Sequence, residues 1–131
     1  EQARGLERFG MELGIAFQLV DDLVDLRGDD RMGKPRGADV YEGKMTLPLI
    51  HALTLSHGHH RQRLSELIEA FSDEDFDELM QLLERSSSME YAEILVRTHL
   101  ERAQAELDRF PDSEAKDMMM LITHVVTERQ A

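Results

Sequence analysis

The sequence contains no cysteine and no tryptophan, and lysine occurs only three times. Without cysteine there is neither a disulfide framework nor thiolate chemistry, which fits a reducing, cytoplasmic environment. No run of about 18 apolar residues is present, so we expect no transmembrane segment. The net charge of −12 disfavours nucleic acids and anionic membranes as partners, because both attract basic surfaces. What remains is 131 residues, about one domain's worth of chain.

The hydrophobic pattern is helical, and the alternation typical of strands is absent. We therefore predict an all-α fold. Thr46 with Pro48 and Ser72 with Asp75 mark two helix starts, and Pro111 ends a long helix. The expected helices span 2–26, 47–56, 60–71, 73–85, 87–109 and 113–128.

Four polar residues lie on one face of the first expected helix. Gln18, Asp21, Asp22 and Asp25 are three, four or seven positions apart and form a stripe. Asp21 and Asp25 are about 6 Å apart along the axis, and like charges at that spacing repel. A divalent cation would offset this repulsion, and Mg²⁺ typically takes one or two carboxylates plus phosphates and waters. The alternative interpretation is a solvated acidic face, which is common in an acidic chain.

A basic, glycine-rich loop follows the acidic stripe. Residues 27–44 contain four of the eight glycines and two of the three lysines, Lys34 and Lys44. Glycine lets the backbone approach an anion closely, and lysine is a compact charge suited to phosphate. The pairing of stripe and loop suits a diphosphate bridged by Mg²⁺, although Asp29, Asp30 and Asp39 also fit an ordinary charged surface loop.

This combination resembles the trans-isoprenyl diphosphate synthases, the polyprenyl synthetase family. The resemblance is strongest over residues 9–53 and weaker beyond them. It corresponds to the second aspartate-rich motif of that family and the segment after it. The residues that carry it are Gly14, Phe17-Gln18-x-x-Asp21-Asp22-x-x-Asp25, Gly33-Lys34, Asp39 and Gly43-Lys44-x-Thr46-Leu47-Pro48-Leu49.

The resemblance implies a role for each matching residue. Asp21, Asp22 and Asp25 would bind Mg²⁺, and Lys34 and Lys44 would bind the allylic diphosphate. Asp21, Asp22 and Lys34 are thereby the candidate catalytic residues. Gln18 would contact the diphosphate side of the pocket. Phe17 would line this pocket, with ordinary helix core as an equal alternative.

The implied reaction joins an allylic prenyl diphosphate to isopentenyl diphosphate and makes a linear polyprenyl diphosphate. The implied fold is an isoprenoid-synthase-type helical bundle, and the implied assembly is a homodimer. Metal ions and lysines at the leaving diphosphate would stabilise the charge that grows as the C–O bond breaks. A terpene-cyclase-like enzyme would use similar chemistry, but the stretch from Gly43 to Pro48 favours chain elongation.

The family uses two facing aspartate-rich motifs, and this sequence contains one. We therefore expect residues 1–131 to be the C-terminal portion of a single polyprenyl synthetase domain, without the upstream portion and its first aspartate-rich motif. Such a portion should be inactive alone and should expose apolar surface where further helices pack. A non-catalytic partner subunit of a prenyl synthase is the alternative.

Two further features have modest expected roles. His57, His59 and His60 are interpreted as a short exposed loop, because no carboxylate or cysteine is spaced for a closed metal site. Arg129 is interpreted as part of a frayed chain end, although a basic residue there could reach a diphosphate.

Overall fold

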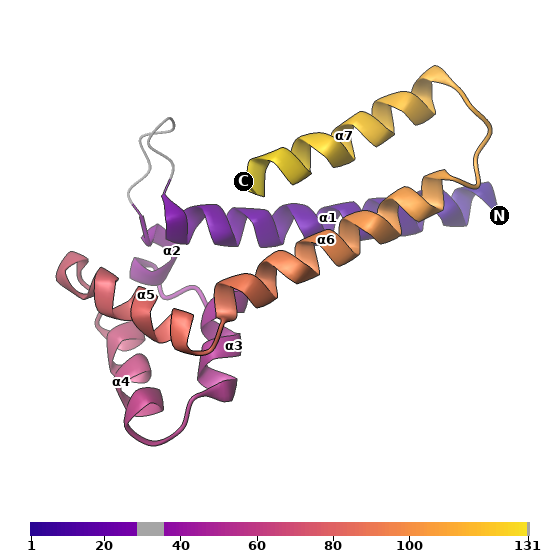
Figure 1. Cartoon of the computed structure of the whole chain (residues 1–131). Helices are drawn as coiled ribbons and strands as arrows, with labels where there is room; N and C mark the ends of the chain where they lie inside the picture. Colours follow the sequence, from indigo (N-terminus) through magenta and orange to yellow (C-terminus); the bar gives the residue numbers. More distant parts are fainter. Residues whose placement is uncertain (29–35, 131) are drawn as a thin grey trace. The chain divides into compact units, whose positions relative to one another are not determined.

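The computed structural model describes residues 1–28 and 36–130, and within these ranges it contains helices and no strand. The all-α prediction is confirmed (Figure 1). Seven α-helices and one 3₁₀ helix occur in the described ranges: α1 (Gln2–Arg27), α2 (Ala38–Tyr41), α3 (Leu47–Leu55), α4 (Gly58–Glu69), η1 (Asp73–Asp75), α5 (Phe76–Arg85), α6 (Ser88–Leu107) and α7 (Glu114–Gln130).

Most helix bounds fall within a few residues of the prediction, and the differences have local causes. The short helix α2 was not predicted, because four residues are too few to show a helical period. The expected helix at 73–85 begins as the separate 3₁₀ turn η1, in which the Asp75 carboxylate accepts hydrogen bonds from the Ser72 backbone N–H and hydroxyl. Thr46 occupies the N-cap position of α3, but its side chain makes no capping hydrogen bond.

The chain divides into two compact units, one formed by Glu1–Asp21 with Glu93–Ala131 and the other by Asp22–Ala92. We call them the long-helix unit and the central unit. In the central unit, leucines from α3, α4 and α5 close around Leu26 and Val40. Leu49, Leu64, Leu79 and Leu83 are completely buried there. This core holds the end of α1 and the short helix α2 against the same layer of apolar side chains.

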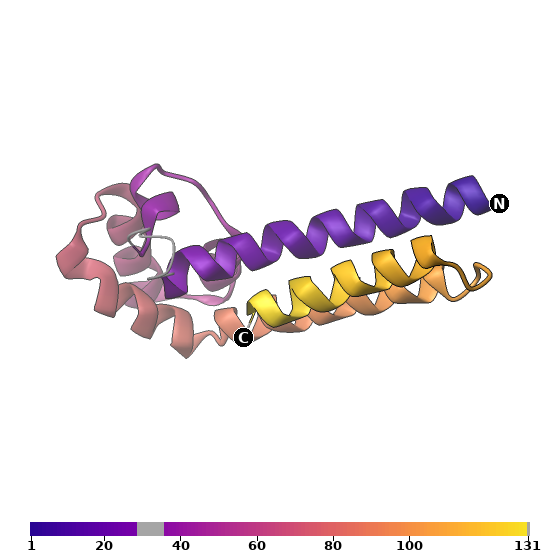
Figure 2. The ribbon, with the colours of Figure 1, turned by 90° about the horizontal axis from the view of Figure 1, so that it is seen from above.

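In the long-helix unit, α1, α6 and α7 run side by side in both views (Figures 1 and 2). Buried residues on α6 recur at Val96, Leu100, Ala103 and Leu107, which is the spacing of one helical face. Ala103 and Leu107 pack with Phe9 of α1, and Met119 and Met120 of α7 pack against this cluster. A hydrogen bond of 3.0 Å from Gln104 to Thr123 also joins α6 to α7.

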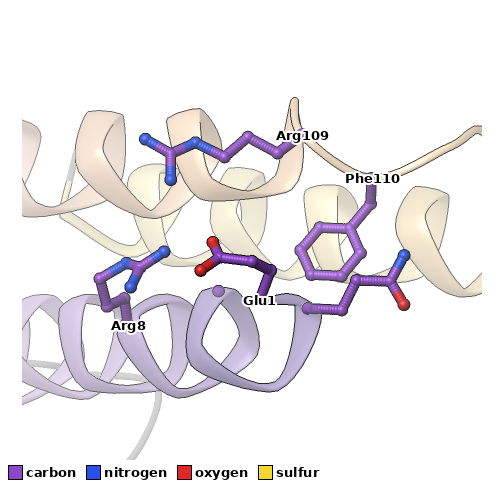
Figure 3. A pocket seen from close by; sticks show the side chains of 6 residues that line it. Glu1, Arg8, Arg109 and Phe110 are labelled. Atoms are coloured by element: carbon purple, nitrogen blue, oxygen red, sulfur yellow. The ribbon is translucent and has the colours of Figure 1, made fainter.

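The first turns of α1 are attached to the end of α6 (Figure 3). The Phe110 ring lies so close to Gly5 that a Cβ atom added there would come within 3.2 Å of it. Arg8 Nε donates a hydrogen bond of 2.8 Å to Glu106 Oε1. This bond is the main cause that lowers the pKa of Glu106 below its ordinary value of 4.5.

Apolar side chains remain exposed on the long-helix unit. On α7 they are Met118, Leu121, Ile122 and Val125, and on α1 they include Met11 and Ile15. A cluster of this kind is typical of a surface that contacts further protein. Among the described helices, none is long and apolar enough to cross a membrane.

The Glu106 carboxylate makes stability depend on pH. Because its pKa is lowered in the folded state, its stabilising effect is present above the unfolded pKa and disappears as the pH falls through the folded pKa. We expect Glu106→Gln to lower the free energy of unfolding at pH 7, and the difference from the parent protein to shrink below pH 4.5. Urea unfolding at several pH values measures this. Glu101→Gln, an exposed change on the same helix, is the control; an equal loss in both variants at all pH values would contradict the prediction.

Candidate metal and diphosphate site

The last two turns of α1 carry the three predicted metal-binding aspartates. The boundary between the two units falls between Asp21 and Asp22, and each side has its own partners. Asp21 is 42 % exposed, whereas Asp22 is 8 % exposed. The stripe is therefore not a uniformly solvated face, because one of its carboxylates is buried.

On the side of the long-helix unit, Asp21 pairs with Arg129 of α7. Arg129 Nη2 lies 3.1 Å from Asp21 Oδ1. The same guanidinium lies 5.2 Å from the centroid of the Phe17 ring, within cation–π range. Phe17 is 46 % exposed in this chain. Gln18 is also exposed.

The interpretation of Arg129 as a frayed end is therefore wrong. The structure shows α7 helical through this residue, and two contacts hold its side chain against α1. No sequence signal joins Arg129 to Asp21, because their contact depends on how α7 folds back along α1.

On the side of the central unit, Asp22 pairs with Lys44. Lys44 Nζ lies 3.8 Å from Asp22 Oδ1 and 3.8 Å from Asp39 Oδ2. Gly43 adopts a φ of 77°, which L side chains rarely adopt, and this turn ends α2. The Lys44 N–H donates to the Asp39 carbonyl at 2.9 Å, so the backbone also holds this lysine beside α2. Asp39 is one of the residues that carry the family resemblance, but the sequence does not predict its ion pair with Lys44.

Asp25 holds the start of α2. Its two carboxylate oxygens each lie 3.2 Å from the Asp39 backbone nitrogen, which donates to them. Its carbonyl accepts a hydrogen bond of 2.9 Å from Gly37, whose φ is 78°. Asp25 therefore positions the segment that carries Asp39 and Lys44. Lys34, the other predicted diphosphate ligand, lies outside the described residues.

The donor chemistry of these aspartates suits Mg²⁺. Their carboxylates are hard oxygen ligands, and the chain already places the cations Lys44 and Arg129 opposite Asp22 and Asp21. In the part of the chain that the structure describes, no three His, Cys, Asp or Glu side chains are grouped so as to hold a metal by themselves. Mg²⁺ does not require such a group, because waters and phosphate oxygens usually complete its octahedron.

Of the three histidines, only His57 lies in a loop. His57 precedes α4, and His59 and His60 belong to its first turn. His57 and His60 line a shallow pocket with Arg85 and the serines that follow it. The exposure of all three histidines and the loop position of His57 agree with the prediction, while the helical placement of His59 and His60 corrects it.

A family model described as polyprenyl synthetase matches residues 1–106. The chain belongs to the polyprenyl synthetase family. Its matched part contains the whole stretch from Phe17 to Leu49, so the sequence resemblance is confirmed at the level of the family.

Known proteins of this kind align with nearly the whole chain. A short chain isoprenyl diphosphate synthase from Methanothermobacter thermautotrophicus is 32% identical over 131 residues, covering 99% of this chain and 40% of that protein. The crystal structure of a decaprenyl diphosphate synthase from Rhodobacter capsulatus has a TM-score of 0.86 at 30% identity, covering 99% of this chain and 40% of that one. The isoprenoid-synthase helical fold is thereby confirmed.

A third relative was solved with ligands. It is a geranylgeranyl pyrophosphate synthase from Corynebacterium glutamicum complexed with isoprenyl diphosphate and magnesium. Its TM-score is 0.86 at 28% identity, covering 96% of this chain and 37% of that one. Members of the family therefore bind a divalent metal. This chain spans about two fifths of the length of these relatives.

The capping role of Asp25 can be tested separately from any metal. We expect Asp25→Ala to speed hydrogen exchange at the Asp39 amide and to lower the free energy of unfolding by about 1 kcal/mol, because it removes a helix-capping acceptor. Asp21→Ala, four residues earlier on α1, is the matched control and should leave the Asp39 amide unchanged. Unaltered exchange in Asp25→Ala would show that the carboxylate does not hold α2.

Proposed function

We propose that this chain is the C-terminal portion, residues 1–131, of a prenyltransferase that condenses an allylic diphosphate with isopentenyl diphosphate into a linear polyprenyl diphosphate. The observation that carries the proposal is the match of the polyprenyl synthetase family to residues 1–106, which include the complete FQxxDDxxD and GKxTLP stretches. The relatives of known function are isoprenyl and polyprenyl diphosphate synthases.

In this proposal Asp21, Asp22 and Asp25 hold Mg²⁺ at the end of α1. Mg²⁺, when bound, supplies Lewis-acid stabilisation to the leaving diphosphate. The partial burial of Asp22 and the hydrogen bonds to Asp25 support a preorganised orientation of these carboxylates, which lowers the reorganisation needed on binding.

Lys34 and Lys44 bind the oxygens of the allylic diphosphate. The side chain of Lys44 is half-exposed and lies between the carboxylates of Asp22 and Asp39. Its ammonium group is therefore accessible to a diphosphate that binds together with a metal ion. As the allylic C–O bond breaks, its electron pair moves to the diphosphate, and the lysines stabilise the growing charge. The isopentenyl double bond then forms the new C–C bond, and a proton is lost.

Gln18 and Phe17 form the part of the pocket near the reacting end. Both side chains are exposed on α1, as the pocket-lining assignment requires. The exposed apolar side chains of α1 and α7 support a surface for the remaining helices of the domain and for a homodimer contact.

The metal role can be tested with Asp21→Ala in the full-length natural protein. We expect the rate of Mg²⁺-dependent condensation to fall by about a hundredfold or more, with little loss of stability, because a half-exposed carboxylate contributes little to folding. Steady-state assays with an allylic diphosphate and isopentenyl diphosphate measure the rate. Glu7→Ala, an exposed acid on the same helix, is the control. A near-normal rate for Asp21→Ala would refute the assigned role.

The 131-residue chain alone should be inactive. It contains one aspartate-rich motif, and the relatives that it matches are about two and a half times as long. We expect no Mg²⁺-dependent condensation by this chain above the protein-free background. Product formation by the isolated chain, abolished by a chelator and absent in Asp21→Ala, would contradict this expectation.

A further inference from the structure

Arg129 makes two contacts with one face of α1. Its guanidinium lies 3.1 Å from Asp21 Oδ1 and 5.2 Å from the Phe17 ring centroid. Phe17 and Asp21 are four positions apart on the helix, so a single side chain from α7 bridges both. All three residues belong to the long-helix unit.

The contact engages one oxygen of the carboxylate that the proposed function gives to a metal. A guanidinium and a divalent cation repel each other, so Arg129 at Asp21 Oδ1 weakens the binding of a divalent cation to the same carboxylate. The sequence pattern assigns Asp21 to a metal, whereas the fold gives it an internal cation.

The contact is also weak enough to be exchanged. The side chain of Arg129 is 39% exposed and that of Asp21 is 42% exposed. Ion pairs this open to water are screened and contribute little to stability. A divalent cation that binds the same carboxylate can therefore displace the guanidinium without disrupting the packed core of the unit.

We propose that Arg129 is a displaceable counter-ion for Asp21, which divalent metal binding releases together with the last turn of α7. Binding at the end of α1 is thereby coupled to the mobility of the C-terminal helix. The inference rests on the proposed metal role of Asp21 and adds to it a residue that competes with the metal.

The test measures the affinity for Mg²⁺ alone, by calorimetry on the full-length natural protein. Because Arg129→Gln removes the competitor, it should bind Mg²⁺ about two- to fivefold more tightly than the parent protein. Arg129→Lys retains a cation and should stay close to the parent. Arg97→Gln removes an exposed arginine of α6 and controls for the change in net charge.

Hydrogen exchange supplies a second readout that does not depend on activity. In the parent protein, Mg²⁺ should speed exchange of the amides at the C-terminal end of residues 124–129, beyond the buried Val126. In Arg129→Gln these amides should exchange quickly with or without Mg²⁺, whereas in Arg97→Gln they should respond as in the parent.

The outcomes separate the two proposals. If Mg²⁺ binds through Asp21 but its affinity in Arg129→Gln equals that of Arg97→Gln and exchange at 124–129 does not respond, the counter-ion proposal is wrong and the metal role stands. If the parent protein binds no Mg²⁺ even when inorganic diphosphate is added, both proposals fail.

Discussion

The aspartates at the end of α1 place like charges within one or two turns of a single helix, and each of them needs a partner. The chain supplies three different ones. Arg129 lies against Asp21, Lys44 against Asp22, and the Asp39 backbone N–H against Asp25. The partner of Asp21 comes from the end of α7 within the long-helix unit, whereas the partners of Asp22 and Asp25 come from α2 and the residues after it within the central unit. These contacts offset the repulsion between the aspartates within α1.

Each unit stabilises its own side of this arrangement by apolar packing. In the central unit the leucines of α3, α4 and α5 hold the last turn of α1 and α2, and so keep Asp25 and Lys44 in place. In the long-helix unit Phe9 and the α6 face hold α7 along α1, so that Arg129 reaches Asp21. Hydrophobic burial fixes the helices, whereas the half-exposed contact between Asp21 and Arg129 adds little to their stability.

Membership of the polyprenyl synthetase family connects these contacts to a chemical role. A leaving diphosphate is stabilised by cations that face it. In an acidic chain, carboxylates can supply such cations by binding metal ions or by orienting lysines. In the proposed function, the grouping of Lys44 with Asp22 and Asp39 orients this lysine for the diphosphate. In the same proposal, the pairing of Asp21 with Arg129 partly neutralises a metal-binding carboxylate before any ligand arrives.

The sequence alone determined the helical class, most helix positions and the family, because the hydrophobic period and the spacing of aspartates and lysines are local properties of the chain. It could not predict α2, because four residues show no period and their conformation depends on the distant Asp25 carboxylate. Nor could it separate the roles of three adjacent aspartates, since burial of Asp22 and exposure of Asp21 arise only when other segments pack against α1. The contact of Arg129 with Phe17 and Asp21 joins residues more than a hundred positions apart, so only the tertiary structure decided it.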